Sequence, residues 1–263
     1  MVRRRTRHRT RRRTRRRRSL RGGTAQFDIV IPVGPNDADI IASQINYTKK
    51  NIIGYRNIYL VSSDPNLQLE GCTTINENIY PFSLNTVKEY VTNTSRCGWY
   101  LQQLLKLYAG TTIPDILPRY LVIDSDTFFL RPTTFVENEV CLYTYVTKFH
   151  PAYFVHMKKL HESFTQQQDK SGICHHMMFE TKYITELMKL VEDTHKEKFY
   201  TVFLSSIDNK ENSGASEYEL YFNYMLGAHP DKIKLRQLKW ADVNTLSDNS
   251  THDFESVHHY LRK

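Results

Sequence analysis

Short apolar runs recur along the chain and predict buried strands. The runs cover residues 27–33, 57–61 and 120–123, and each is followed by a group of polar or turn-forming residues. A further short strand is expected near residues 73–75. We expect these runs to form the strands of one sheet.

Two segments between the runs have the spacing of amphipathic helices. In residues 37–52 and 96–108, apolar positions recur with a period of roughly 3.6 residues, and Gly110 stands just beyond the expected end of the second helix. The order strand, helix, strand, helix, strand predicts an α/β fold, a mostly parallel sheet flanked by helices. In such a sheet, ligands bind outside the carboxyl ends of the strands.

The positive charge of the chain is concentrated at one end. The 263 residues include 36 Lys and Arg against 28 Asp and Glu, a formal net charge of +8. The first 21 residues hold 13 arginines and no acidic residue, so the rest has 23 basic against 28 acidic residues, a net charge of −5. We therefore expect no specific nucleic-acid binding by the folded part, which lacks a positive excess to neutralise phosphates.

Residues 1–23 are predicted to be a disordered Arg-rich tail, and residues 24–263 a single domain. The tail has almost no apolar side chain whose burial could offset the loss of chain entropy. Three interpretations stay open for it: a solvated arm, a nuclear-targeting or polyanion-binding segment, and a segment that attaches to an anionic surface such as lipid.

The remaining composition predicts a cytoplasmic protein. The four cysteines form no C-x-x-C pair, and no apolar run approaches the roughly 20 residues of a membrane span. The Arg-rich start is followed by Gly-Gly-Thr and not by the apolar region of a secretory signal.

The triplet Asp124-Ser125-Asp126 directly follows the apolar run at residues 120–123. Two carboxylates at the end of a buried strand carry a large desolvation cost unless a cation or strong donors accompany them. A hard divalent ion meets this need, and Mn²⁺ or Mg²⁺ completes its shell with water and substrate phosphates. The triplet therefore predicts a metal site for a phosphorylated ligand; a strand-end turn with a capping Asp is the alternative.

The motifs together resemble those of a known family. Residues 120–130 (YLVIDSDTFFL), with residues 27–33 and 96–106 upstream, resemble predicted GT-A type glycosyltransferases of bacteria and large DNA viruses, and the similarity continues through residues 171–178 and 216–221. The resemblance implies a Rossmann-like GT-A domain that binds a nucleotide sugar through a divalent metal and transfers the sugar to an acceptor hydroxyl. For a viral protein, the expected location becomes the host cytoplasm.

The resemblance also implies roles for single residues. Asp126 is the expected direct metal ligand, and Asp124 is expected to bind the ribose or a second metal position. In many enzymes of this type a histidine near the chain end supplies another ligand. His258 is favoured over His259 because it comes first after a short extended run. A solvated histidine pair is the alternative.

The helix expected at residues 96–108 carries a polar stripe that suits the diphosphate and sugar of a donor. Arg96 and Lys106 are the expected phosphate-binding groups, since phosphate oxygens favour cationic donors. An ordinary solvated helix face is the alternative. The stripe consists of Arg96, Trp99, Gln102, Gln103 and Lys106.

A base is needed if the transfer inverts configuration, because the acceptor hydroxyl must lose its proton. Ser216 and Glu219 have the spacing of a capping box, which accounts for Glu219 and leaves Glu217 as the predicted base. The helix N-terminus is expected to hold the pKa of Glu217 down. A Glu that only complements the helix dipole is the alternative, and a retaining mechanism needs no such base.

Other predicted donor contacts come from the strand ends. Pro32 and Val33 follow the first strand, Asp64 follows the second, and Ser125 lies within the acidic triplet. We expect them to contact the nucleotide. Asp37 is interpreted as a helix N-cap.

His175 and His176 lie in a predicted loop before a helix. We expect them to contact the acceptor or the donor phosphates, with a packing role as the equal alternative.

The sequence thus predicts a metal-dependent glycosyltransferase that uses a UDP-, GDP- or dTDP-linked sugar and a glycan or protein acceptor. A nucleotidyltransferase is the second candidate, but Gly34 stands alone where a glycine-rich phosphate loop would follow the first strand. The third candidate is a non-enzymatic viral or nuclear protein that binds polyanions through its tail. Such a protein would have no use for the Asp pair. No oligomeric state is predicted.

Overall fold

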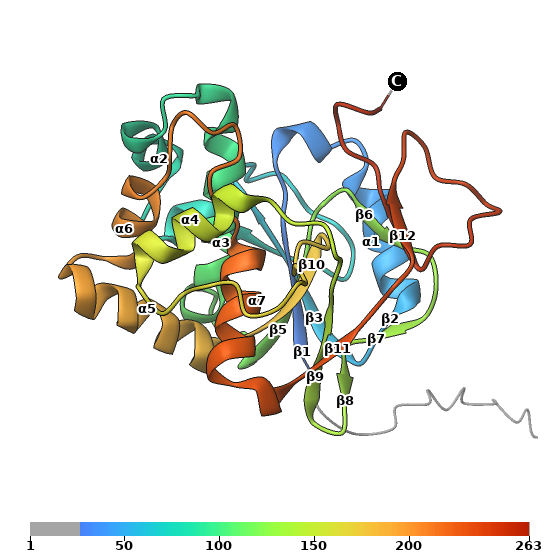
Figure 1. Cartoon of the computed structure of the whole chain (residues 1–263). Helices are drawn as coiled ribbons and strands as arrows, with labels where there is room; N and C mark the ends of the chain where they lie inside the picture. Colours follow the sequence, from blue (N-terminus) through green and yellow to red (C-terminus); the bar gives the residue numbers. More distant parts are fainter. Residues whose placement is uncertain (1–26, 263) are drawn as a thin grey trace, which may run out of the picture.

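A five-stranded sheet lies at the centre of the structure, a computed structural model that describes residues 27–262 (Figure 1). The strand order is β10-β5-β1-β3-β4, and only β10 runs antiparallel to its neighbour. The predicted mostly parallel sheet is confirmed, whereas the tail predicted at residues 1–23 lies outside the described residues. The strands are β1 (Phe27–Pro32), β3 (Tyr55–Ser62), β4 (Thr73–Asn76), β5 (Arg119–Ile123) and β10 (His176–Glu180).

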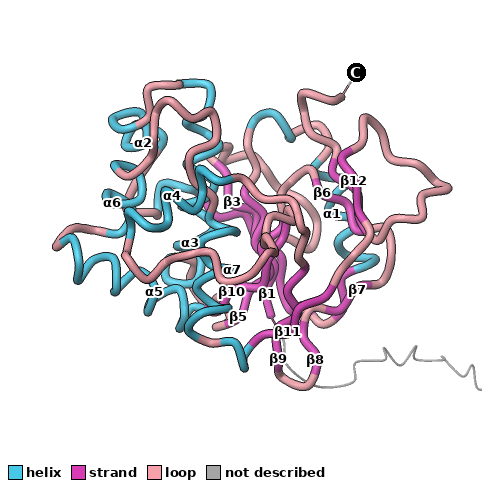
Figure 2. Tube along the Cα trace, in the orientation of Figure 1, coloured by secondary structure: helices cyan, strands magenta, loops and turns pink. Residues whose placement is uncertain are grey.

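Helices lie on both sides of this sheet, with α1 on one side and α3, α5 and α7 on the other (Figures 1 and 2). The helix α3 packs on β1 and β5, and α5 packs on β10. The prediction of a sheet flanked by helices is therefore also confirmed. The helices are α1 (Ile41–Asn51), α2 (Leu84–Tyr90), α3 (Cys97–Thr112), α4 (Pro151–Leu160), α5 (Thr181–His195), α6 (Phe199–Ser205) and α7 (Glu217–Ala228).

Short strands form three smaller sheets, with the orders β11-β9-β8, β12-β13-β6 and β2-β7. The second of these joins the end of the chain to the strand that follows the acidic triplet. Their strands are β2 (Ile52–Ile53), β6 (Thr127–Phe129), β7 (Thr133–Thr134), β8 (Val136–Glu137), β9 (Val140–Thr144), β11 (Ile233–Arg236), β12 (Trp240–Asp242) and β13 (Phe254–Ser256).

Two details of the predicted elements are wrong. Gly110 lies inside α3 rather than beyond its end. A Cβ atom there would collide with the side chains of Thr181 and Tyr120, so close packing and not helix capping requires the glycine. The segment after His175 continues as β10 before it becomes the helix α5.

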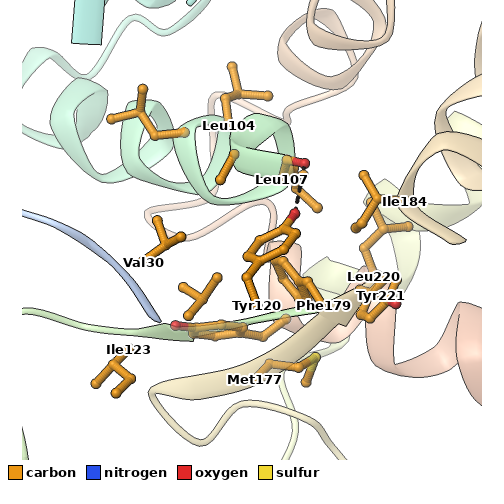
Figure 3. Close-up of a cluster of buried hydrophobic side chains, with 14 of the residues drawn as sticks. Val30, Leu104, Leu107, Tyr120, Ile123, Met177, Phe179, Ile184, Leu220 and Tyr221 are labelled. Atoms are coloured by element: carbon orange, nitrogen blue, oxygen red, sulfur yellow. Dashed lines mark hydrogen bonds between the residues drawn. The ribbon is translucent and has the colours of Figure 1, made fainter. Parts of the chain in front are cut away.

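The core that carries the site lies between the sheet and the α3, α5 and α7 helices. Tyr120 of β5 and Phe179 of β10 meet edge to face at 5.7 Å, and Tyr221 of α7 packs against Phe179 at 4.7 Å (Figure 3). The Tyr120 hydroxyl lies 3.4 Å from the carbonyl oxygen of Leu107 on α3, to which it donates. Because burying a large apolar side chain contributes roughly 1.5–3 kcal/mol, these contacts fix the ends of β5 and β10 firmly against the helices.

The described residues include no helix that is both long and apolar enough to cross a membrane. The four cysteines are free thiols, and three of them are buried. Burial raises the pKa of Cys141 and of Cys174, so both thiols pack as small neutral groups.

Candidate active site

The acidic triplet lies at the carboxyl end of β5, in the turn that leads into β6. The Thr127 N–H donates to the carbonyl of Asp124 at 3.0 Å, which closes the turn. The Asp124 N–H donates to the carbonyl of His175 at 3.0 Å, which ties the turn to the start of β10. The side chains of Asp124 and Asp126 are 19% and 14% exposed. Both carboxylates are therefore fixed by backbone contacts at the edge where ligands bind in such sheets.

The C-terminal segment reaches the triplet through the pairing of β13 with β6. The Thr127 and Ser256 hydroxyls lie 2.8 Å apart, and the Val257 N–H donates to the carbonyl of Asp126 at 2.8 Å. The next residue, His258, then places its Nδ1 atom 2.7 Å from Oδ2 of Asp126. The alternative of a solvated histidine pair is therefore wrong for His258.

Asp242 on β12 completes a cluster that sequence reasoning missed. Its Oδ1 atom lies 3.1 Å from Nε2 of His258 and 3.4 Å from Nε2 of His175. The Nδ1 atom of His175 lies 3.3 Å from Oδ2 of Asp124. Each imidazole ring therefore stands between two carboxylates. Asp242 belongs to no recognisable sequence motif. It reaches the cluster only because β12 pairs with β13.

The carboxylates of the cluster keep both histidines charged. Burial lowers the pKa of His258, but Asp126 and Asp242 outweigh it and raise the pKa to about 10. For His175, Asp124 and Asp242 outweigh burial in the same way and raise the pKa to about 9. Hydrogen bonds from both rings hold the pKa of Asp242 below its usual range. When their own ring protons supply the positive charge, both histidine rings are therefore cationic at neutral pH.

A buried lysine connects the triplet to α7. The side chain of Lys106 is only 2% exposed, and its ammonium donates to Asp124 at 2.5 Å and to Glu217 at 2.7 Å. The Tyr218 hydroxyl donates to the same oxygen of Asp124 at 2.8 Å. Burial lowers the pKa of Lys106, but its two carboxylate partners outweigh it and raise the pKa. Burial likewise raises the pKa of Asp124, and Lys106 and His175 overcome this and hold that pKa below its usual range.

The predicted base, Glu217, is the first residue of α7 and is buried. Its carboxylate accepts from Lys106, and its backbone N–H donates to Oε1 of Gln103 at 3.2 Å. Burial raises the pKa of Glu217 more than Lys106 lowers it. The expectation that the helix N-terminus holds this pKa down is therefore wrong, because desolvation dominates.

The predicted capping box is only half present. Oγ of Ser216 accepts from the Glu219 N–H at 3.2 Å, as expected of an N-cap. The Glu219 carboxylate does not return to the Ser216 backbone. It accepts instead from the Ser171 hydroxyl and from the Asn223 side chain, the latter at 2.7 Å, and so joins α7 to the loop before β10.

The polar stripe of α3 divides into two parts. Gln103 and Lys106 are buried, so the alternative of a solvated face is wrong for these two. Gln102 and Trp99 are half-buried. The Arg96 guanidinium lies 4.0 Å from the centroid of the Trp99 ring. It also donates to the carbonyl of residue 212 and to the hydroxyl of residue 213, both at 2.8 Å, and thereby fixes the loop before α7.

His175 and His176 have opposite environments. His176 is buried, lies 3.0 Å from Oγ1 of Thr144 through its Nε2 atom, and packs against Phe129 and Phe254. Burial lowers the pKa of His176 to about 3. The packing alternative describes His176, whereas His175 faces the carboxylates. His175, which has a positive φ of 60°, is the residue directly before β10.

Asp37 is not the N-cap that the sequence suggested, because α1 begins only at Ile41 and has no side-chain cap. Its carboxylate instead accepts from the Ser125 hydroxyl at 2.5 Å and forms an ion pair with Arg262. Burial raises the pKa of Asp37 against the effect of these donors. Asp37 therefore links the triplet to the last described residue of the chain.

The remaining predicted contacts lie at the ends of the neighbouring strands. Pro32 is the last residue of β1, and the N–H of the next residue, Val33, donates to the carbonyl of Val61 on β3 at 2.8 Å. Asp64 is exposed beyond β3, and its carboxylate accepts from the Asn66 N–H at 2.8 Å. Because β1, β3 and β5 are parallel, these residues share one edge of the sheet with the triplet.

Comparison with known proteins places this site within one family. Residues 37–261 match the family of unknown function DUF6492. The chain belongs to this family. No curated protein matches the sequence. Among solved structures, the chain is similar to mouse xyloside xylosyltransferase 1 in its apo form, with 10% sequence identity, a TM-score of 0.43, and coverage of 88% of this chain and 97% of that chain.

The part that matches DUF6492 contains all the residues of the cluster, and their donor atoms suit a divalent cation. One ligand atom each from His175, Asp242 and His258 lies within 4.8 Å of the others, and Asp126 contacts His258. Carboxylate oxygen combined with imidazole nitrogen suits transition-metal ions such as Mn²⁺ and Zn²⁺. A cation would replace the ring protons as the positive charge that these carboxylates require.

Proposed function

We propose that this DUF6492 protein is a metal-dependent glycosyltransferase that moves a sugar from a nucleotide-sugar donor to a hydroxyl of a glycan or protein acceptor. The observation that carries the proposal is the 2.7 Å approach of His258 to Asp126 at the carboxyl end of β5. A D-x-D triplet alone occurs by chance in many chains. Here the fold brings an imidazole from 132 positions away onto the triplet, at the edge where α/β sheets bind ligands.

The donor site in this proposal lies along the carboxyl ends of β1, β3 and β5. Mn²⁺ or Mg²⁺, held by carboxylate and imidazole groups, neutralises the diphosphate of a UDP-, GDP- or dTDP-linked sugar when it is bound. Lys106 and Tyr218 hold one oxygen of Asp124 in place, so that this carboxylate keeps a fixed orientation toward the donor. The proposed donor contacts are Pro32, Val33, Asp64, Arg96, Trp99, Gln102, Gln103, Lys106, Asp124, Ser125 and His175, and the buried His176 is not among them.

The contacts of Glu217 bear on how the acceptor is activated. In the inverting form of the proposal, Glu217 takes the acceptor proton, and its ion pair with the buried Lys106 has to open first. In the retaining form no base is needed, and Glu217 only holds Lys106 against Asp124. Glu217→Gln separates the two forms. Loss of transfer with unchanged donor binding supports the inverting form, and near-normal transfer rates contradict the assignment of Glu217 as the base.

A donor screen on the full chain tests the function itself. Thermal stabilisation and sugar-nucleotide hydrolysis are measured with UDP-, GDP- and dTDP-linked sugars, with and without Mn²⁺. We expect one nucleotide class to stabilise the protein only with metal present, by about 2.7 kcal/mol when the ligand is at 100 times its Kd. The Asp126→Ala variant should lose this response, whereas Asp248→Asn, at an exposed position between β12 and β13, should keep it. No response to any nucleotide with metal would overturn the proposal.

A further inference from the structure

The imidazole rings of His175 and His258 each direct their Nε2 atom toward the same carboxylate oxygen of Asp242. The Nε2 atoms of His258 and His175 lie 3.1 Å and 3.4 Å from Oδ1 of Asp242. Ligands bound at about 2.1 Å to one tetrahedral or octahedral ion lie about 3.0 to 3.5 Å from their neighbours. The two nitrogen–oxygen separations are therefore those that a single cation imposes, and one ligand atom from each of the three residues lies within 4.8 Å of the others.

The opposite nitrogen of each ring contacts a carboxylate of the acidic triplet. Nδ1 of His175 lies 3.3 Å from Asp124, and Nδ1 of His258 lies 2.7 Å from Asp126. Histidines that bind metals through one nitrogen commonly donate the other N–H to a carboxylate, which fixes the tautomer and the orientation of the ring. Both histidines have this arrangement when Nε2 is the ligand atom, and Asp124 and Asp126 are then the orienting carboxylates.

The neighbouring residues hold the three groups in place. The Trp240 ring packs edge-on against His175 at 5.0 Å and stacks on Phe254 at 5.5 Å. Asp242 lies two residues further along β12 and pairs with Ser256, the last residue of β13, two positions before His258. Within residues 27–262, no Lys or Arg forms an ion pair with Asp242 or Asp126. The positive charges that face these two carboxylates are therefore the ring protons of the histidines, which a bound cation would replace.

We infer that His175, Asp242 and His258 form a transition-metal site that takes an ion such as Co²⁺, Zn²⁺ or Mn²⁺ without help from a nucleotide. The ligands are the two Nε2 atoms and a carboxylate oxygen of Asp242, and water fills the open positions. Imidazole nitrogens favour such ions over Mg²⁺ and Ca²⁺, which prefer oxygen ligands. The site differs from the one implied by the resemblance, in which Asp126 is a direct ligand, and it does not depend on the proposed transferase activity.

Titration of the full chain with Co²⁺ in the absence of nucleotide tests this site. Binding is followed by the visible ligand-field absorption of the protein-bound ion and, in parallel, by calorimetry. We expect one strong site in the wild type that Mg²⁺ does not displace. Asp242→Asn and His175→Gln each remove a ligand and should weaken binding at least 100-fold and change the spectrum. Asp126→Asn removes only an orienting group, so it should weaken binding about 10- to 100-fold with a similar spectrum.

Two controls and two contrary results make the outcome decisive. His259→Gln, beside a proposed ligand, and Asp248→Asn, between β12 and β13, should bind Co²⁺ as the wild type does. If Asp126→Asn abolishes binding while Asp242→Asn preserves it, the site at Asp242 is wrong and the ion binds the triplet. Absence of Co²⁺ binding without nucleotide overturns the inference as well, but leaves a nucleotide-dependent metal site and the proposed function standing. Conversely, Co²⁺ binding with no response in the donor screen retains this site and rejects the transferase.

Discussion

Lys106 is the residue on which the charge balance of the interior depends. Its ammonium is the shared partner of Asp124, in the turn after β5, and of Glu217, the first residue of α7. Removing one partner of a buried ion pair leaves an uncompensated charge, which is more costly than the pair itself is stabilising. The same ammonium sets the orientation of Asp124, so its effect on stability and its effect on the site are linked.

Replacement of Lys106 by Met should therefore destabilise the protein strongly. We expect a loss of about 3–5 kcal/mol in the free energy of unfolding, measured by urea denaturation. The double variant Lys106→Met/Glu217→Gln should recover part of this loss, because one of the unpaired carboxylates is gone. Lys189→Met serves as the control, since its pair with Asp193 is exposed and screened by solvent and should contribute little to stability. Equal effects of the two lysine substitutions would contradict the assignment.

A second residue, His156, predicts how stability depends on pH. Its Nε2 atom lies 2.9 Å from the carbonyl oxygen of Phe203, and within the described residues its Nδ1 atom has no partner. Burial lowers its pKa to about 4, below the value of about 6.5 in an unfolded chain. The unfolded state binds more protons between these values, so this contribution to stability is complete above pH 6.5 and is lost as the pH falls toward 4.

The expected loss from this group amounts to about 3 kcal/mol at pH 4, from about 1.4 kcal/mol per pKa unit. His156→Gln, which keeps a donor for the Phe203 carbonyl, should reduce the slope of unfolding free energy against pH between 6.5 and 4. Urea denaturation of the wild type and the variant across that range measures the difference. Parallel curves for the two proteins would show that His156 does not titrate as its burial requires.

Residue-level prediction from the sequence is strongest where chemistry and position coincide. Asp124 and Asp126 stand directly after an apolar strand, and their desolvation cost alone is enough to predict a site there. Asp242 and Asp37 carry no such mark. They reach the cluster through the pairing of β12 with β13 and through the contact with Ser125, respectively, and both result from the tertiary fold. The single sequence contains no local signal for either contact.

At the level of elements, the α3 helix connects packing to the site. It carries Lys106 and lies so close to β5 and α5 that Gly110 has no room for a side chain. Gly98 lies on the same helix, and a Cβ atom there would meet nothing within 4 Å. The two glycines therefore provide a matched pair within one element.

Gly110→Ala should lower stability by about 1–3 kcal/mol, because the added methyl forces α3 away from Tyr120 and Thr181. Gly98→Ala should raise stability by about 0.4–1 kcal/mol, since it only reduces the entropy of the unfolded chain. Thermal and urea unfolding of both variants give the comparison. If Gly110→Ala were neutral or stabilising, the close approach of α3 to the sheet would be wrong.

The length of the apolar pattern in each element explains which elements could be predicted. The strands β1, β3 and β5 and the helix α3 have long, regular apolar patterns, and the sequence identifies them with small errors at their ends. The strands β6, β12 and β13 have three residues each, too few to show a period. Their pairing is decided by the tertiary packing, and with it the place of His258 and Asp242.

In the whole molecule, the concentrated positive charge and the candidate site lie in different parts of the chain. Residues 27–262 contain every group of the candidate site, and the family match over residues 37–261 covers the same part. The 13 arginines within the first 21 residues lie outside both ranges. Anion binding by the tail and metal binding by the cluster should therefore be separable properties.

Deletion of residues 1–21 tests this separation. Removing 13 arginines changes the formal net charge from +8 to −5, so the truncated chain should elute from heparin at much lower salt than the full chain. Its thermal stability and its Co²⁺ binding should be unchanged, because no residue of the cluster is removed. A variant with the 13 arginines replaced by Ser keeps the length and should behave like the deletion, which assigns heparin binding to charge. Unchanged heparin elution would place anion binding in the acidic remainder of the chain, and weaker Co²⁺ binding would mean that the tail takes part in the site.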